Sequence, residues 1–271
     1  MDARTLLVLD GAADAALEGL VAAERYVAPS AMQASASAAP IRAAPAAGAV
    51  QLDQLLFGEP FHVLEARGAW AFGQAGRDGY VGWTAVEALS APVLTPTHRV
   101  SALRAHAFAE PDIKSAPAGL YSLNALVTAE AREGRFVRAA RAGWFVEGAL
   151  APVGSGFPSE PVAVAERFLG TPYLWGGRES LGLDCSGLVQ AALHACGRAC
   201  PRDSDQQRDL GRPADPDRPA RGDLWFWRGH VGWLSAPDRL LHANAHGMAV
   251  VDEPLADALA RMGPPEAARR R

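Results

Sequence analysis

Apolar residues at the start of the chain recur at near-helical spacing. Alanine, leucine and acidic residues alternate through residues 1–27 around Leu17 and Leu20, which predicts a helical N-terminal extension. The Ala/Ser/Pro-rich stretch 28–45 follows, and its composition predicts a loose connector. β-type patterning is therefore expected only from about residue 50.

From about Val50 to Leu89 the pattern changes to short apolar runs separated by glycine, which is typical of a small β-barrel or meander. The same theme returns about 60 residues later, where Gly82-Trp83 recurs as Gly143-Trp144. An internal duplication explains this repeat. The pattern predicts two small β domains, one over residues 28–90 including the connector and one over residues 91–153.

The pattern changes again after the linker 151–161, which is rich in proline and glycine. Helical periodicity followed by β-type runs indicates an α+β domain over residues 158–265, and the charged end 266–271 is expected to be a solvated, frayed tail. The helices are expected at 162–169 and 188–195, and the strands at 224–227, 231–234, 240–242 and 249–251.

The composition is that of a folded globular chain. Of 271 residues, 49% are hydrophobic and 21% are charged, which excludes wholesale disorder and leaves room for more than one domain. The net charge is −4 and the basic residues form no stripe, so nucleic acid is not an expected partner.

Two features bear on the cellular compartment. The N-terminal apolar run 6–9 ends at Asp10, too short for the core of a signal peptide, and no apolar stretch approaches the roughly 18 residues of a membrane span. The three cysteines, Cys185, Cys196 and Cys200, are an odd number, so at least one thiol is free. These features predict a cytoplasmic protein with reduced thiols and no membrane partner.

Cys185 lies at the first turn of a predicted helix. A thiol there meets unpaired backbone N–H groups and the positive end of the helix dipole, which favour the thiolate. Cys185 is therefore a candidate nucleophile, although a lone cysteine is most often a small buried hydrophobic residue.

His230 and His242 lie on neighbouring predicted strands joined by a turn at Pro237-Asp238. Residues whose numbers share parity point to the same sheet face, so the two imidazoles are expected to be direct or diagonal cross-strand neighbours. His230 would then accept the Cys185 proton, and His242 would hold the tautomer of His230.

Five segments of the third domain occur in an order that is specific to one family. They are Pro172-Tyr173-Leu174-Trp175-Gly176-Gly177, Asp184-Cys185-Ser186-Gly187-Leu188-Val189-Gln190, Pro201-Arg202-Asp203-Ser204-Asp205-Gln206-Gln207, Arg221-Gly222-Asp223-Leu224 and His230-Val231-Gly232. Through them, residues 158–255 resemble the NlpC family of bacterial cell-wall cysteine peptidases, which have a circularly permuted papain-like fold. The resemblance implies that Cys185 is the nucleophile, His230 the base and His242 the third, polar member of a triad.

The same resemblance implies roles for four further residues. The hydroxyl of Tyr173, twelve residues before Cys185, would stabilise the tetrahedral oxyanion together with the Cys185 N–H. Asp184, Ser186 and Ser204 would bind backbone and carboxylate groups of the substrate. The structural alternatives are a plain helix N-cap for Asp184 and a turn residue for Ser204.

The first half of the chain resembles the bacterial SH3-like domains of γ-D-glutamyl-L-diamino-acid endopeptidases of murein recycling, through segments 54–59 and 78–83. In those enzymes an acid and a tyrosine hold the free amine of an N-terminal L-Ala. The matching residues are Glu59 and Tyr80, with Trp83 as an alternative to Tyr80. A substrate with a blocked N-terminus would leave the buried carboxylate unpaired, which is costly.

The expected fold class is multidomain α+β, with two SH3-like barrels followed by a papain-like, NlpC-type cysteine peptidase domain. The resemblance implies hydrolysis of the bond between γ-D-Glu and a diamino acid, meso-diaminopimelate or lysine, in small peptidoglycan-derived peptides with a free N-terminal L-Ala. Three alternatives stay open: a hydrolase of intact cell wall anchored by its SH3-like domains, a non-catalytic muropeptide-binding module, and an acyltransferase. No cofactor is expected, and no metal, because Cys196 and Cys200 lack the second ligand pair of a zinc finger.

Overall fold

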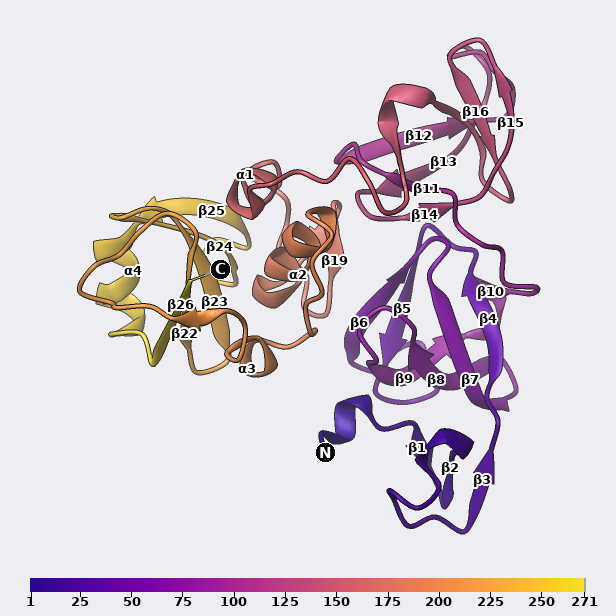
Figure 1. Ribbon diagram of the computed structural model, residues 1–271, viewed down its shortest axis with the longest axis horizontal. Helices are drawn as coiled ribbons and strands as arrows, with labels where there is room; N and C mark the ends of the chain where they lie inside the picture. Colours follow the sequence, from indigo (N-terminus) through magenta and orange to yellow (C-terminus); the bar gives the residue numbers. More distant parts are fainter. Residues whose placement is uncertain (271) are drawn as a thin grey trace. The chain divides into compact units, whose positions relative to one another are not determined.

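The computed structural model describes residues 1–270 and divides into two compact units, which meet in sequence between Ser155 and Gly156 (Figure 1). Within residues 1–270, no helix is long and apolar enough to cross a lipid bilayer. The three cysteines are all buried and free, which confirms the prediction of at least one free thiol.

The first 27 residues do not form the predicted helix. Asp2 and Asp14 each accept a hydrogen bond from the backbone N–H two residues further on and close short 3-10 turns, and the positive φ angles of Asp10 and Gly11, 44° and 76°, reverse the chain between them. The apolar residues at near-helical spacing therefore do not form the buried face of a helix: Leu20, one of those residues, is 63% exposed. The elements are η1 (Ala3–Thr5), β1 (Val8–Leu9), β2 (Ala12–Asp14), η2 (Ala15–Leu17) and β3 (Arg25–Val27), with β1, β2 and β3 in one sheet.

The stretch 28–45 is not a loose connector either. It contributes β4 (Ser30–Ala34) and β5 (Ala38–Arg42) to a seven-stranded sheet of order β10-β4-β7-β8-β9-β5-β6. Its small alanines fit the interior, where Ala34 and Ala39 are buried with Ile41 in the core of this first barrel. The other elements are β6 (Gln51–Leu56), β7 (Pro60–Arg67), β8 (Trp70–Ala75), β9 (Val81–Ala85), η3 (Val86–Ala88) and β10 (Leu89–Ser90).

The second barrel repeats part of this order, because β15–β16–β17–η4–β18 follows the same sequence of elements as β7–β8–β9–η3–β10. The two barrels share a core, in which Phe57 of the first packs edge-on against Tyr121 of the second with ring centroids 4.9 Å apart. Residues 1–155 therefore form one compact unit. The elements are β11 (His98–Val100), β12 (Arg104–Phe108), β13 (Pro117–Ser122), β14 (Leu126–Val127), β15 (Ala129–Glu133), β16 (Phe136–Ala139), β17 (Gly143–Val146), η4 (Glu147–Ala149) and β18 (Leu150–Pro152).

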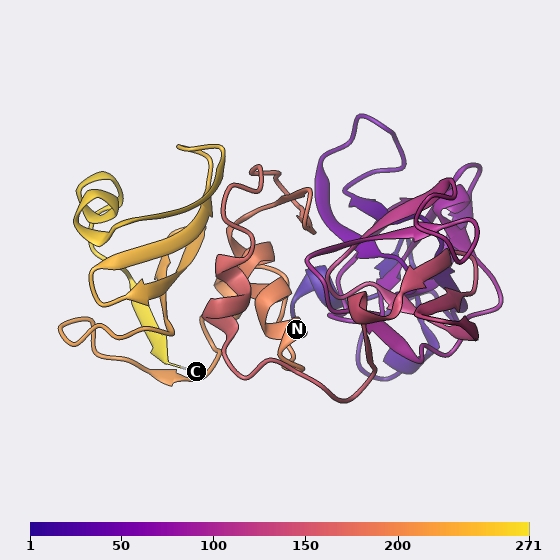
Figure 2. The same ribbon diagram turned by 90° about the horizontal axis from the view of Figure 1, so that it is seen from above.

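The second unit places an antiparallel sheet between α4 on one face and the pair α1 and α2 on the other, as both views show (Figures 1 and 2). The two predicted helices and four predicted strands of this domain are all present. The helices are α1 (Pro161–Glu166), α2 (Cys185–Ala195), α3 (Ser204–Gln207) and α4 (Leu255–Met262). The strands are β19 (Arg178–Glu179), β20 (Gly182–Leu183), β21 (Arg212–Pro213), β22 (Asp223–Trp227), β23 (His230–Ala236), β24 (Arg239–Asn244), β25 (Ala249–Pro254) and β26 (Ala267–Arg270).

The predicted frayed tail is wrong for residues 267–270, while residue 271 lies outside the described residues. Ala267–Arg270 forms β26, which pairs antiparallel with β22. Arg270 donates to both oxygens of the fully buried Asp223, at 2.7 and 2.8 Å. The charge at the end of the chain therefore neutralises a carboxylate inside the domain, and the sheet extends beyond residue 265.

Candidate active site

The nucleophile position is built by the start of α2. Asp184 caps this helix by accepting the Gly187 N–H at 2.7 Å, which makes Cys185 the first helical residue. Gly187 allows the first turn to approach the preceding loop, because a Cβ there would lie 2.2 Å from the Gly177 carbonyl oxygen. Cys185 is buried, and the backbone N–H groups of Ser186 and Val231 interact with its sulfur.

Burial, with a smaller contribution from the charge of Asp184, raises the pKa of Cys185 to about 12. The two backbone N–H groups and Arg202 act in the opposite direction without outweighing burial. The backbone N–H of Ser186 at the helix terminus lowers the pKa of the thiol, as expected, but desolvation is the stronger effect. Cys185 is a neutral thiol at rest.

His230 and His242 form the diagonal pair that the strand parity predicts. The register of β23 and β24, with Trp233 opposite Leu241, sets His242 across from Gly232. The absent side chain at Gly232 leaves room for the contact, and His230 Nε2 lies 2.7 Å from His242 Nδ1. Burial, with a smaller contribution from His242, lowers the pKa of His230 to about 3, so the ring is neutral and able to accept a proton.

The second imidazole is held by two residues that the sequence analysis missed. His242 is fully buried, and its Nε2 lies 2.7 Å from Glu253 Oε1 and 2.8 Å from Asn244 Nδ2. Glu253 also forms an ion pair with Arg261 of α4. The predicted strand ended at Val251, whereas β25 continues to Pro254 and carries Glu253 on the same sheet face as His242.

Tyr173 is partly buried beside the nucleophile, with which it interacts electrostatically. Burial raises the pKa of Tyr173 to about 12, and the charges of Cys185 and Asp184 act in the same direction. The phenol therefore stays protonated at neutral pH and can donate a hydrogen bond.

Asp184 is the centre of a buried network. Its oxygens accept five hydrogen bonds, and a carboxylate offers about four lone-pair positions. The donors are Gly176 N at 2.9 Å, Ser186 Oγ at 3.3 Å, Gly187 N at 2.7 Å, and Arg202 Nη1 and Nη2 at 3.0 and 2.7 Å. Of the two roles considered for Asp184, the helix N-cap is thus observed, and no acceptor capacity is left for a substrate N–H.

Ser186 and Ser204 differ in their surroundings. The Ser186 hydroxyl lies inside the same network, where it accepts from Arg202 at 2.9 Å. Ser204 is partly exposed as the first residue of α3, next to the capping residue Asp203. Ser204 is therefore the more accessible of the two hydroxyls.

Glu59 and Tyr80, expected to bind a substrate amine, are both buried in the first unit. Glu59 pairs through Oε1 with Arg77 and accepts the Leu56 N–H on Oε2 at 3.0 Å. Arg77 also donates to the carbonyl oxygen of Asn124 at 3.0 Å, which links the two barrels. An ammonium can reach Glu59 only by displacing Arg77 or by joining it. Trp83, the alternative to Tyr80, is buried against Phe72.

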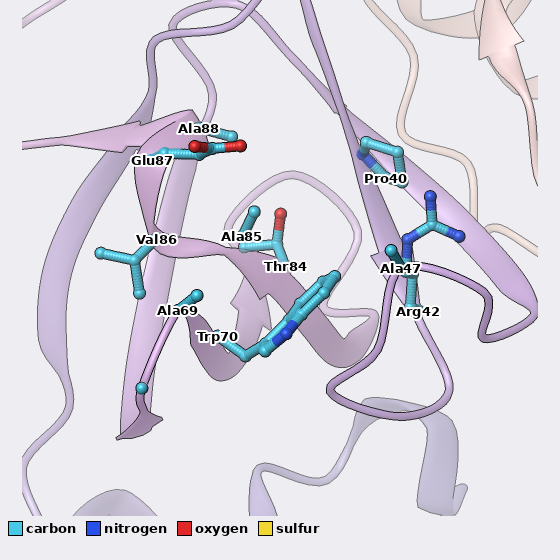
Figure 3. Close-up of a pocket in the computed structure, with 11 residues that line it drawn as sticks. Pro40, Arg42, Ala47, Ala69, Trp70, Thr84, Ala85, Val86, Glu87 and Ala88 are labelled. Carbon is cyan, nitrogen blue, oxygen red and sulfur yellow. The ribbon is translucent and has the colours of Figure 1, made fainter.

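The first barrel has a separate concave site with a volume of about 480 Å³. Figure 3 shows the indole of Trp70 at its base, with Arg42 and Glu87 on opposite sides. Thr84 also lines it, and the Thr84 hydroxyl is buried without a hydrogen-bond partner among residues 1–270. An aromatic surface beside a few polar groups is typical of a ligand site.

The structure thus has two β-barrels followed by an α+β domain, in which a cysteine at a helix start lies in the same domain as a pair of strand histidines. Residues 170–259 match the NlpC/P60 family, and residues 41–89 match the bacterial dipeptidyl-peptidase SH3 domain. The chain therefore contains an NlpC/P60 domain and, before it, a bacterial SH3 domain.

Several curated relatives match part of the chain. A γ-D-glutamyl-L-lysine dipeptidyl-peptidase of Bacillus subtilis is 36% identical over 91 residues, 31% of each chain. Dipeptidyl-peptidase 6 of Lysinibacillus sphaericus is 35% identical over 34% of each chain, and a probable NlpC endopeptidase homologue of Haemophilus influenzae is 34% identical over 30% of this chain and 46% of its own. The matched segment thus covers about a third of the length of each of the first two relatives.

One solved structure resembles nearly the whole chain. An NlpC/P60 family protein from Bacillus cereus superposes with a TM-score of 0.77 over 89% of this chain and 99% of its own, at 22% sequence identity. At this identity the likeness establishes the shared fold.

Proposed function

We propose that the chain is a cysteine endopeptidase that hydrolyses the γ-D-Glu–diamino acid bond of peptidoglycan-derived peptides with a free N-terminal L-Ala. The observation that carries the proposal is the buried Cys185 at the start of α2, against Val231 and beside the His230–His242 pair, within an NlpC/P60 domain. The relatives named γ-D-glutamyl-L-lysine dipeptidyl-peptidase support this class of substrate.

In the acylation step, the Cys185 thiol gives its proton to His230 and the sulfur attacks the γ-carbonyl carbon. The thiolate and imidazolium attract each other, which offsets part of the cost of charging two buried groups. The Tyr173 hydroxyl and the Cys185 N–H donate to the oxyanion that forms. The C–N bond then breaks, and His230 returns the proton to the leaving amine of the diamino acid.

Deacylation reverses these roles. His230 takes a proton from a water molecule, whose oxygen attacks the thioester carbon. The C–S bond breaks, L-Ala-γ-D-Glu leaves as the γ-carboxylic acid and loses its acid proton to water, and His230 returns its own proton to the Cys185 sulfur.

Because Cys185 is a neutral thiol at rest, its reactivity towards iodoacetamide does not distinguish a catalytic site from an inert binding module. With the pKa of Cys185 raised to about 12, iodoacetamide should alkylate it slowly at neutral pH even in an active enzyme. Slow alkylation therefore does not favour the module, and turnover is the decisive measurement.

Selection for a free N-terminus would depend on Glu59 and Tyr80. A substrate ammonium beside Glu59 would share the carboxylate with Arg77 or displace the Arg77 guanidinium. An N-acetylated terminus carries no positive charge and could do neither. We therefore expect the free peptide to be strongly preferred over the acetylated one.

The test is a mass-spectrometric digest of L-Ala-γ-D-Glu-meso-diaminopimelate and its N-acetylated form. We expect wild type to release L-Ala-γ-D-Glu from the free peptide alone, and Cys185→Ala to release none. Cys196→Ala is the matched control, because Cys196 is also a buried cysteine outside any disulfide, at the other end of α2. Cleavage by Cys185→Ala at the wild-type rate would refute the proposal.

The concave site of the first barrel favours a second candidate, a hydrolase of intact cell wall that the barrel anchors. Trp70 offers a surface for stacking on a sugar ring, with the charged side chains of Arg42 and Glu87 on either side. Co-sedimentation with purified peptidoglycan tests this candidate. Retention that Trp70→Ala abolishes would support it, whereas no retention of wild type would exclude it.

A further inference from the structure

The buried nitrogen Nε2 of His242 faces two side chains, one of which requires a proton on Nε2 while the other requires Nε2 to be unprotonated. Glu253 Oε1, 2.7 Å away, can only accept a hydrogen bond while it is ionised, so it requires a proton on Nε2. Asn244 Nδ2, 2.8 Å away, can only donate, so it requires a bare Nε2. The Asn244 amide cannot simply flip, because its Oδ1 accepts the Gly247 N–H at 2.6 Å.

The outcome at Nε2 decides which nitrogen of His230 is free. Burial lowers the pKa of both His230 and His242, so each neutral ring carries one proton. The 2.7 Å contact between His230 Nε2 and His242 Nδ1 has room for one proton. If His242 holds its proton on Nε2, His230 must donate from Nε2, and its Nδ1 is a bare acceptor. In the opposite arrangement His230 Nδ1 is already protonated and cannot act as a base.

We propose that Glu253, held by Arg261, is a positioning residue that fixes the tautomers of both histidines so that His230 Nδ1 can accept the Cys185 proton. The proposal rests on the proposed function for its catalytic consequence, but the tautomers themselves are a property of the resting protein.

The hydrogen bond to Glu253 is the stronger of the two, so His242 carries its proton on Nε2. A hydrogen bond to a carboxylate is about twice as strong as one between neutral groups. Burial acts to raise the pKa of Glu253, but hydrogen bonds from Arg261 and His242 outweigh it and hold that pKa below its ordinary value. The carboxylate is therefore ionised at neutral pH. In the opposite arrangement its Oε1 would face the lone pair of Nε2, which is repulsive.

The direct test is ¹⁵N NMR of the histidine side chains in the full-length chain at neutral pH. In wild type we expect His230 and His242 each to be protonated on Nε2 and bare on Nδ1. A wild-type spectrum with His230 protonated on Nδ1 would overturn the proposal without any variant and without any reference to activity.

Glu253→Gln tests the cause. A neutral amide no longer outcompetes Asn244, so the tautomer ratio should shift by roughly tenfold towards Nδ1-protonated His230. Asp252→Asn is the control, because Asp252 on the same strand accepts hydrogen bonds from Ser235 and Arg239 and acts on His242 through its charge, so the substitution removes a charge without removing an acceptor at Nε2. An unchanged spectrum in Glu253→Gln, or the same shift in the control, would contradict the proposal.

Asn244→Asp in the Glu253→Gln background tests the competition itself. The new carboxylate keeps one oxygen for the Gly247 N–H and presents the other to Nε2, so the wild-type tautomers should return. With the proposed substrate, kcat should fall about tenfold in Glu253→Gln and recover in the double variant, while KM stays constant. Wild-type tautomers in an inactive wild-type protein would refute the proposed function and leave the positioning role standing.

Discussion

Replacing Arg202 by methionine should destabilise the second unit by about 3–5 kcal/mol. The Arg202 side chain is 1% exposed and that of Asp184 8%, so water cannot replace the lost guanidinium. Asp184 would keep three hydrogen bonds, from Gly176, Ser186 and Gly187, but its charge would stay buried and uncompensated. Against a typical total stability of about 5–15 kcal/mol, this loss is large.

The assay is urea unfolding of four proteins: wild type, Arg202→Met, Asp184→Asn and the double variant. The double variant should be more stable than Arg202→Met alone, because a neutral amide removes the uncompensated charge, with a coupling energy of at least about 1 kcal/mol. Arg221→Met is the matched control. Arg221 is 40% exposed and pairs with carboxylates that are 35–45% exposed, so its loss should cost about 1 kcal/mol or less.

Two results would contradict a stabilising buried ion pair between Arg202 and Asp184. One is an Arg202→Met protein within about 1 kcal/mol of wild type, which would mean that the carboxylate is solvated or protonated without cost. The other is strict additivity of Arg202→Met and Asp184→Asn, which would mean that the two side chains do not interact.

Three further predictions follow from the site. Because burial lowers the pKa of His230 from 6.5 to about 3, the unfolded chain binds this proton first, so the free energy of unfolding should fall as pH drops from about 6.5 towards 3. In His230→Gln the free energy of unfolding should fall less between pH 6.5 and about 3 than in wild type, as urea unfolding at several pH values would show. The same dependence on pH in both proteins would contradict a buried neutral imidazole at position 230. Tyr173→Phe should lower kcat roughly 100-fold with little change in KM in steady-state assays, and an unchanged kcat would remove Tyr173 from the oxyanion site. Glu59→Gln should narrow the difference in kcat/KM between free and N-acetylated tripeptide, and an unaltered ratio would exclude Glu59 from amine recognition.

The helix start at Cys185 and the contact between the two histidines could be predicted from the sequence because both depend on local rules. Asp184 marks the start of a helix, and shared parity across a short turn places His230 and His242 on one face. These regularities need only the period of a strand and the preference of a cap, and both hold in the structure.

The front of the chain could not be predicted by the same rules. Alternating alanines, leucines and acids resemble a helix, yet side-chain hydrogen bonds at Asp2 and Asp14 and the left-handed backbone at Gly11 divide residues 1–27 into turns and short strands. In the stretch 28–45, an alanine-rich composition suggests a linker, although small side chains also suit a tightly packed strand such as β5.

The residues that tune the site were missed because their partners are distant in sequence. Arg202 reaches Asp184 eighteen residues back, Glu253 reaches His242 eleven residues back, and Arg270 reaches Asp223 forty-seven residues back. Each is a charged residue that composition alone places in solvent. Only the packed domain shows that each neutralises or orients a buried group.

Trapping the acyl-enzyme tests directly whether Cys185 is the nucleophile. The tripeptide reaction is quenched with acid within the first turnovers, and the protein is analysed by intact mass and by peptide mapping. We expect a thioester-linked L-Ala-γ-D-Glu group on Cys185 alone, with no adduct in Cys185→Ala. Turnover of the tripeptide by the Cys185→Ala protein, or an adduct confined to Cys196 or Cys200, would contradict the assignment of Cys185 as the nucleophile.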